Sequence, residues 1–215
     1  MIKLPYLSPS LYLNKKIALV GSSGVLSGSG RGKEIDSFEE VIRFNRAPTN
    51  SYEEDVGSKT TVRVLNNHVF LNTNKFFKAE QYSRLDFSFT KNIKNNKIIL
   101  LGNIVDLQRF RKSKENYYKR NNTIHTFDYS LMSDIKTKVN FSSTKNMSVG
   151  AVFLSLLLIA KTEFYIFGFD REIKDVTHYW QNRPKVMSHY HDQYVEKYWL
   201  NKIIKENRQV KYIDL

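Results

Sequence analysis

The sequence has no cysteine among its 215 residues, which excludes disulfide bonds. The absence of cysteine also permits a reducing compartment. Long apolar runs are missing as well. Residues 1–16 contain nothing as long as a signal-peptide core, and the run at residues 151–160 is too short to cross a bilayer. We therefore expect a soluble cytoplasmic protein whose only membrane contact is peripheral, at an anionic inner face.

Three nucleotide-binding signatures are absent. A P-loop fails at two positions, because Ser27 stands where its first glycine belongs and Glu34 where Ser or Thr is required. The dinucleotide fingerprint G-x-G-x-x-G fails because Lys33 stands at its last glycine position. No aspartate pair has the D-x-D spacing with which many nucleotide-sugar enzymes hold a metal. This favours a site that works without a metal.

Acidic residues are few: 21 Asp and Glu stand against 34 Lys and Arg, for a net charge of +13. This excess suits an anionic ligand such as a nucleotide, an anionic glycan or a membrane face, and also nucleic acid. An AT-rich genome would produce the same lysine-rich composition. With 41% hydrophobic residues, the chain is expected to form one globular domain over residues 1–215.

Residues 16–66 predict the front half of a nucleotide-binding α/β unit. A continuous apolar run at residues 17–20 is typical of a buried parallel strand. It leads into a glycine-rich turn, a helical segment at residues 34–40, and strands at 41–45 and 61–66. Further strands are expected at residues 97–102, 123–128, 163–167 and 210–215. The predicted fold is α/β and Rossmann-like: a mostly parallel sheet of about seven strands flanked by helices, with the ligand at their carboxyl ends.

This stretch resembles the large sialylmotif, the donor-binding motif of eukaryotic-type sialyltransferases of glycosyltransferase family 29. The matching residues are V-G-S-S-G-x-L-x-G-S-G at 20–30, I-D-S at 35–37, V-I-R-F-N-R-A-P at 41–48 and D-V-G-S-K-T-T at 55–61. The resemblance implies donor contacts from Gly21, Ser22, Ser23 and Asn45, and a structural role for Asp36. By sequence chemistry alone, Asn45 is equally well interpreted as a turn residue.

A second block begins at Ser148. The apolar run after it predicts a buried helix, which Ser148 caps, while Gly150 leaves first-turn N–H groups open to an anion. S-x-G at 148–150 and Y-I-F-G-F-D at 165–170 resemble the small sialylmotif. The resemblance implies that Ser148, Val149, Gly150 and Gly168 bind the CMP part of the donor.

The last block carries two histidines. H-Y-W-Q at 178–181 resembles the third sialylmotif, with His178 and the donor-binding Tyr179, and H-x-x-x-x-E at 191–196 resembles the last. A helix is expected to start near Asp192, because apolar residues recur at helical spacing after it. His191 then lies at the helix N-terminus, where the dipole disfavours imidazolium and favours a neutral general base. Glu196 is expected to accept N–H groups in the first turn, a structural role.

The resemblance implies an inverting, metal-independent enzyme with a variant of the GT-A fold and no cofactor. Its donor is CMP-sialic acid and its acceptor an oligosaccharide or glycolipid. His191 would be the base, and His178 would assist departure of the CMP phosphate. The loops at residues 66–95 and 171–187 would choose the acceptor.

Family members of eukaryotes are membrane-anchored and link their two main motifs by a disulfide. Ile17 and Lys161 stand at the corresponding cysteine positions here. We therefore expect a bacterial or viral member.

Two alternatives stay open. One is the same chemistry with CMP-Kdo, since contacts to CMP do not select the sugar. The other is a nucleotide- or nucleic-acid-binding module without catalysis, which lysines interleaved with aromatic residues permit. The module leaves His178 and His191 without a role, so we expect no nucleic-acid partner.

Overall fold

Seven strands form one sheet in the computed structural model, which describes residues 15–71, 96–113, 122–171, 178–180 and 191–215. The strand order is β5-β4-β3-β2-β1-β6-β7, and every neighbouring pair is parallel. The prediction of a mostly parallel sheet of about seven strands is confirmed. The strands are β1 (Ile17–Val20), β2 (Glu40–Phe44), β3 (Val62–Asn66), β4 (Asn96–Gly102), β5 (Asn122–Asp128), β6 (Phe164–Phe167) and β7 (Val210–Tyr212).

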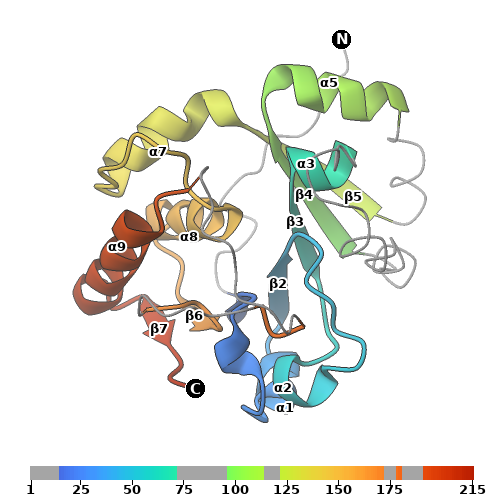
Figure 1. The fold of residues 1–215 in the computed structure, drawn as a ribbon, viewed down its shortest axis with the longest axis vertical. Coiled ribbons are helices and arrows are strands. Elements are labelled where there is room, and N and C mark those ends of the chain that lie inside the picture. The colour runs from blue at the N-terminus through green and yellow to red at the C-terminus, as the bar shows by residue number, and fades with distance from the viewer. Residues whose placement is uncertain (1–14, 72–95, 114–121, 172–177, 181–190) are drawn as a thin grey trace.

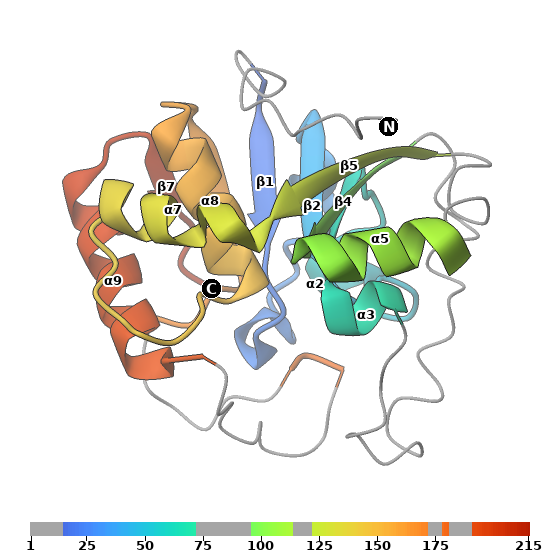
Figure 2. The same cartoon turned by 90° about the horizontal axis from the view of Figure 1, so that it is seen from above.

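Helices cover both faces of the sheet (Figures 1 and 2). Strand β4 shows why: Ile99 and Leu101 pack in the cluster that includes the helices α7, α8 and α9, while Ile98 and Leu100 pack in the cluster of α3 and α5. A parallel sheet covered on both faces needs apolar residues at every position. The helices are α1 (Gly32–Asp36), α2 (Glu53–Val56), α3 (Asn67–Leu71), α5 (Ile104–Ser113), α7 (Met132–Lys138), α8 (Val149–Ile159) and α9 (Gln193–Glu206), with short 3-10 turns η2 (Gly24–Leu26) and η4 (Tyr129–Leu131).

Some element boundaries differ from the expected ones. Helix α1 ends at Asp36 and does not reach residue 40, because Phe38 is already buried in the core and Glu40 pairs with Ile17 in the sheet. The last strand ends at Tyr212 and not at residue 215. Helix α9 begins where it was expected, directly after its cap at Asp192.

Helix α8 is the apolar centre of one layer. Seven of its residues are buried, and they pack in one apolar cluster with residues of the sheet, α7 and α9. It has 11 residues. Among the residues that the structure describes, no helix combines the length and the apolar character needed to cross a bilayer.

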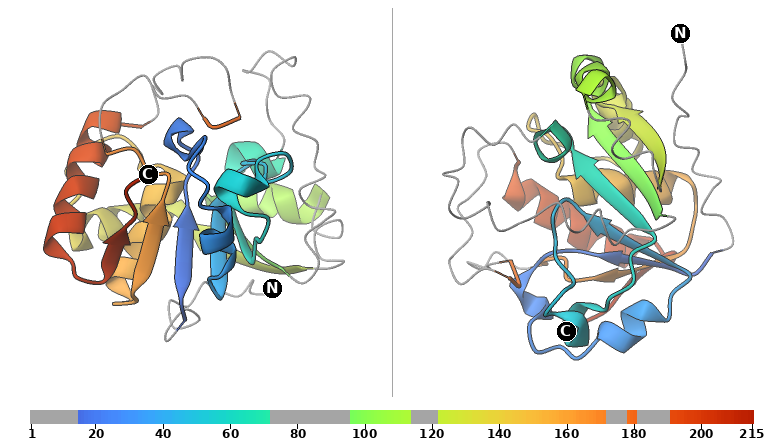
Figure 3. Two further views of the ribbon diagram at one scale, coloured as in Figure 1. Left: turned by 90° about the horizontal axis from the view of Figure 1, so that it is seen from below. Right: turned by 90° about the vertical axis from the view of Figure 1, so that its right-hand side faces the viewer.

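The strand order places the ligand-binding edge. Strand β1 has β2 on one side and β6 on the other, so the order of connection reverses at the gap between β1 and β6. In open parallel sheets, ligands bind outside the carboxyl ends of the strands at such a switch point. Helices α8 and α9 each lead into a parallel strand, so both begin at this same edge. Figure 3 (left) shows residues 178–180 (orange) near η2 (blue) on this side.

A buried carboxylate ties strands together at the opposite edge. Glu40 accepts hydrogen bonds from the ammonium groups of Lys15 and Lys97 and from the hydroxyl of Thr61. Burial alone would raise the pKa of Glu40, but the hydrogen bonds from Lys15, Thr61 and Lys97 outweigh it and hold that pKa below its ordinary value. The ionised carboxylate therefore stabilises the fold.

Substitution of Glu40 should change stability in a pH-dependent way. Because the pKa of Glu40 is lower in the folded than in the unfolded chain, its contribution is present above the ordinary value of 4.5 and is lost as the pH falls through the folded-state value. We expect Glu40→Gln to lower the free energy of unfolding by about 1–3 kcal/mol at pH 7 and by less below pH 4. Urea titrations of both proteins, with exposed Glu39→Gln as control, measure this. A loss that is equal at pH 3 and pH 7 would contradict it.

Candidate active site

Two glycines meet at the switch point between β1 and β6. The N–H of Gly21 donates to the carbonyl of Phe167 over 2.8 Å, and the N–H of Ser23 donates to the carbonyl of Gly168 over 3.2 Å. A Cβ at Gly21 would lie 2.2 Å from the Gly168 oxygen, so no side chain fits. Gly168 has φ +64°, a left-handed conformation that favours glycine. Two of the predicted donor-binding residues are thus in direct contact.

A single phenyl ring separates this turn from the start of α8. Built Cβ atoms at Gly21 and Gly150 would each lie 3.0 Å from the ring of Phe169, which also packs edge-on against Phe44 at 5.9 Å. The ring of Phe169 therefore packs between the two segments that were predicted to bind the donor. The sequence analysis did not select it, because an aromatic residue after a buried strand carries no local signal of a binding role.

The outer part of the glycine-rich loop is occupied from within the protein. The N–H groups of Gly28 and Gly30 donate to the two carboxylate oxygens of Asp55 over 2.8 and 2.9 Å. An acidic side chain thus fills the place that an anion could take. The part of the loop left for a ligand is its beginning, from Gly21 to Ser23.

The N-terminus of α8 is joined to α9 through Ser148. Its hydroxyl accepts the N–H of Ala151 over 3.2 Å, which confirms the predicted cap, and donates to the carboxylate of Glu196. The N–H of Ser148 donates to the same carboxylate over 2.9 Å. Glu196 thus supports the first turn of α8, not of its own helix, which Asp192 caps.

This arrangement determines which groups of α8 can hold an anion. The Ser148 hydroxyl donates its hydrogen bond to Glu196, so it has no further hydrogen to donate to a ligand. The N–H groups of Val149 and Gly150 lie in the first turn, where an intrahelical carbonyl cannot reach them. They point along the positive end of the helix dipole and are the donors that remain for a phosphate.

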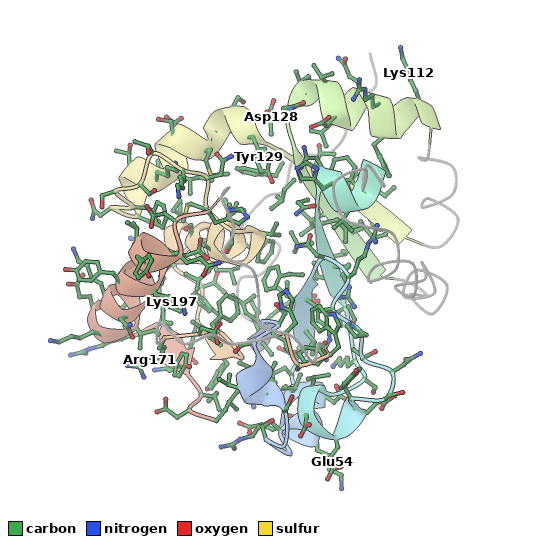
Figure 4. All side chains as sticks on the ribbon, in the orientation of Figure 1. Glu54, Lys112, Asp128, Tyr129, Arg171 and Lys197 are labelled. Carbon is green, nitrogen blue, oxygen red and sulfur yellow. The ribbon has the colours of Figure 1, made fainter. Side chains whose placement is uncertain are left out.

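The turn after β6 is held in a similar way. Ser23, buried at 6% exposure, donates its hydroxyl to the carboxylate of Asp170. The guanidinium of Arg171, which is labelled in Figure 4, donates to Asn201 of α9 over 2.8 Å and stacks 4.8 Å above the ring of Tyr212 in β7. The turn that carries Gly168 is therefore fixed to β1, α9 and β7 together.

Asn45 ends β2 in a left-handed conformation, with φ +48°. Its side-chain oxygen accepts the N–H of Asn66 over 3.1 Å, which leaves the amide hydrogens as donors toward a ligand. Arg63 supports this turn from below, because its Nη1 donates to the carbonyls of Asn45 and Ala47 over 3.4 and 2.9 Å. Burial, and then the neighbouring Arg43, lower the pKa of Arg63 to about 9.

The third predicted motif attaches to the glycine turn. The N–H of Tyr179 donates to the carbonyl of Ser22 over 3.2 Å, and Nδ1 of His178 lies 3.2 Å from the same oxygen. The His178 ring stacks on Trp180 with centroids 4.5 Å apart. Tyr179 is buried and donates its hydroxyl to the carbonyl of Pro48, and burial raises the pKa of Tyr179 to about 12. Tyr179 anchors the segment, so a ligand cannot use its hydroxyl proton.

His191 attaches to the segment that precedes α8. Its Nδ1 lies 3.1 Å from the carbonyl oxygen of Asn146, two residues before Ser148. A carbonyl only accepts, so in both His191 and His178 the proton belongs on Nδ1. A neutral ring held this way has its basic lone pair on Nε2. His178 thus attaches to the turn at Ser22 and His191 to the segment before α8, the two segments that Phe169 separates.

One predicted structural residue, Asp36, and the predicted acceptor loops remain to be placed. Asp36 accepts from the N–H and hydroxyl of Ser58 and the N–H of Lys59, each over 2.8–2.9 Å, and so holds the turn before β3. Much of the expected acceptor loops, at 72–95, 172–177 and 181–187, lies outside the described residues. Within the described part, no group of three or more His, Asp or Glu side chains is arranged to hold a metal.

A double-mutant cycle tests the link between α8 and α9. Ser148→Ala removes a helix cap and should cost about 1 kcal/mol of unfolding free energy. We expect Ser148→Ala and Glu196→Ala to be coupled by about 1 kcal/mol or more, because each removes the partner of the other. Urea titration of the two single variants and the double variant gives the coupling, with exposed Ser142→Ala as a neutral control. Simple additivity would show that this pair adds nothing.

Comparison with known proteins gives a family match over most of the chain. Residues 10–208 match "Glycosyltransferase family 29 (sialyltransferase)". Beta-galactoside alpha-2,6-sialyltransferase 2 of Takifugu rubripes is 49% identical over 63 residues, which cover 29% of this chain and 12% of that protein. The Homo sapiens protein of the same name is 46% identical over 63 residues, with the same coverage. The matched stretch is therefore a small part of these relatives.

Solved structures share the fold. A mammalian sialyltransferase in complex with Gal-beta-1-3GalNAc-ortho-nitrophenol superposes with a TM-score of 0.71 at 21% identity, over 96% of this chain and 72% of that one. The sialyltransferase CstII from Campylobacter jejuni, in complex with cytidine-5'-monophosphate, superposes with a TM-score of 0.55 at 15% identity, over 93% and 79%. Because the family match extends from residue 10 to residue 208, this chain belongs to glycosyltransferase family 29, the sialyltransferases.

Proposed function

We propose that this chain transfers sialic acid from CMP-sialic acid to a hydroxyl of a galactoside-containing glycan, with inversion and without a metal. One observation carries the proposal: His178 and His191 attach to the two segments that lie on either side of Phe169, and each has its Nδ1 at a main-chain carbonyl. Family membership supports the sialic acid donor. The galactoside acceptor is supported by the names of the relatives and by the glycan bound to the mammalian structure.

The donor nucleotide would bind along the carboxyl edge of β1, β2 and β6. The N–H groups of Val149 and Gly150 would hold the phosphate, aided by the helix dipole. The amide hydrogens of Asn45 and the main chain of Gly21 and Ser22 would line the other side. Because the backbones of Gly21 and Gly168 touch, the ligand lies over them and over Phe169, not between them.

The transfer needs one base and a stabilised leaving group. Nε2 of His191 takes the proton of the acceptor hydroxyl as the acceptor oxygen bonds to the anomeric carbon. The bond from that carbon to the phosphate oxygen breaks, and CMP departs with the electron pair. His178, with Nδ1 on the Ser22 carbonyl, donates from Nε2 to the phosphate oxygen in its protonated form. A single in-line displacement inverts the anomeric configuration.

Two further expectations remain proposals. A cytoplasmic location rests only on the composition of the sequence. A bacterial or viral source gains no support from the relatives named above, since those of matched sequence are vertebrate proteins. The proposed chemistry depends on neither.

His191→Ala should abolish transfer and leave donor binding intact. Loss of a general base lowers kcat by about 10²–10⁴-fold, while CMP contacts on α8 and β1 are untouched. The measurement combines release of CMP from CMP-sialic acid with a galactoside acceptor, and calorimetric titration of CMP. Activity should persist in EDTA.

The controls separate the alternatives. Faster turnover of CMP-Kdo than of CMP-sialic acid would change the donor assignment. Tight RNA binding with no CMP release from either donor would favour the binding module. Full activity of His191→Ala would refute the assignment of the base.

A further inference from the structure

A lysine outside all four motifs holds the turn that orients His191. The ammonium of Lys136, in α7, donates to the carbonyl of Ser143 over 3.0 Å and to the carbonyl of Lys145 over 2.6 Å. Both carbonyls belong to the turn at residues 143–146, whose last residue, Asn146, gives its carbonyl to Nδ1 of His191. The ammonium therefore binds the carbonyl of Lys145, which directly precedes the Asn146 carbonyl that contacts the His191 ring.

The same turn is tied to the residue after His191. Its Ser143 hydroxyl donates to the carboxylate of Asp192 over 3.2 Å and accepts the N–H of Lys145 over 3.1 Å. The other oxygen of Asp192 accepts the N–H of Val195 and caps α9. Turn and helix therefore share one hydrogen-bonded frame, and a shift of the turn moves the Asn146 carbonyl relative to the imidazole.

The surroundings of Lys136 keep its ammonium in place. Partial burial of Lys136 lowers the pKa of its ammonium. The ammonium lies 5.9 Å from the ring of Phe141, which packs edge-on against Trp199 of α9. The indole N–H of Trp199 donates to the carbonyl of Val139 over 2.9 Å, so the end of α7 is fixed to α9 as well.

We propose that Lys136 is a positioning residue for the general base, which it orients through the turn at residues 143–146. The proposal rests on the function proposed above for His191. Base catalysis depends on the direction of one lone pair, and misplacement by about 1 Å can cost about 10²-fold in rate. The donor contacts lie on other groups, at Val149, Gly150 and Asn45, so the loss should fall on kcat and spare donor binding.

Lys136→Met tests this directly, because it removes the ammonium and keeps most of the aliphatic stem. We expect kcat to fall by about 10-fold or more, with the KM for CMP-sialic acid within about twofold of the parent. Lys136→Arg keeps two donors and should recover most of the rate. Exposed Lys138→Met, on the same helix, is the matched control for lost charge and should retain the parent rate. Equal kcat in Lys136→Met and the parent would overturn the proposal.

A spectroscopic measurement separates this proposal from the proposed function. The ¹⁵N shifts of His191 report which ring nitrogen carries the proton, with or without transfer. In the parent we expect the Nδ1–H form, and in Lys136→Met a mixture of both tautomers, while the CMP affinity stays within twofold. This result supports positioning even if the parent transfers no sialic acid. Unchanged His191 shifts in a folded Lys136→Met would overturn it, whatever the activity.

Discussion

The main chain of Gly21 touches the main chain of Gly168, and the rest of the site follows from that contact. A methyl group at Gly21 would approach the Gly168 oxygen to 2.2 Å, so the two turns can close only without a side chain between them. The contact joins segments that are more than 140 positions apart and sits where the strand order reverses. It also fixes Phe169, whose ring sets the spacing to Gly150 and α8. Two motifs that are remote in sequence thereby pack against the same phenyl ring.

Several polar side chains of the site use their hydrogen-bond donors within the protein, so other groups would have to contact a ligand. The hydroxyl groups of Ser23 and Ser148 donate hydrogen bonds to the carboxylates of Asp170 and Glu196. The Tyr179 hydroxyl donates to the carbonyl of Pro48. The groups that such contacts leave open to a ligand include the main-chain N–H groups at the start of α8 and the amide hydrogens of Asn45. Groups fixed in this way need no reorganisation when charge develops, which is the basis of electrostatic preorganisation.

The sequence predicted the features that local patterns encode. Continuous apolar runs located the parallel strands, the serine before an apolar run located the α8 cap, and the apolar stripe after Asp192 located α9. It did not predict partners across long separations. Glu196 was assigned to its own helix but binds α8, Asp55 was not seen to fill the glycine loop, and Lys136 carried no signal. Such contacts depend on how whole elements pack, which periodicity and spacing do not contain.

Partners that can only accept hydrogen bonds fix the orientation of the hydroxyl and imidazole protons in the site. A carboxylate or a carbonyl cannot donate, so a hydroxyl or imidazole beside it must point its proton toward it. Glutamine in place of Glu196 could donate as well as accept, and the Ser148 hydroxyl would then have two orientations. Other pairs in the site also join a group that can donate or accept to a partner that only accepts. They are Ser23 with Asp170, Tyr179 with Pro48, His178 with Ser22 and His191 with Asn146. Each of these hydroxyl and imidazole groups therefore has one proton orientation, which its acceptor sets.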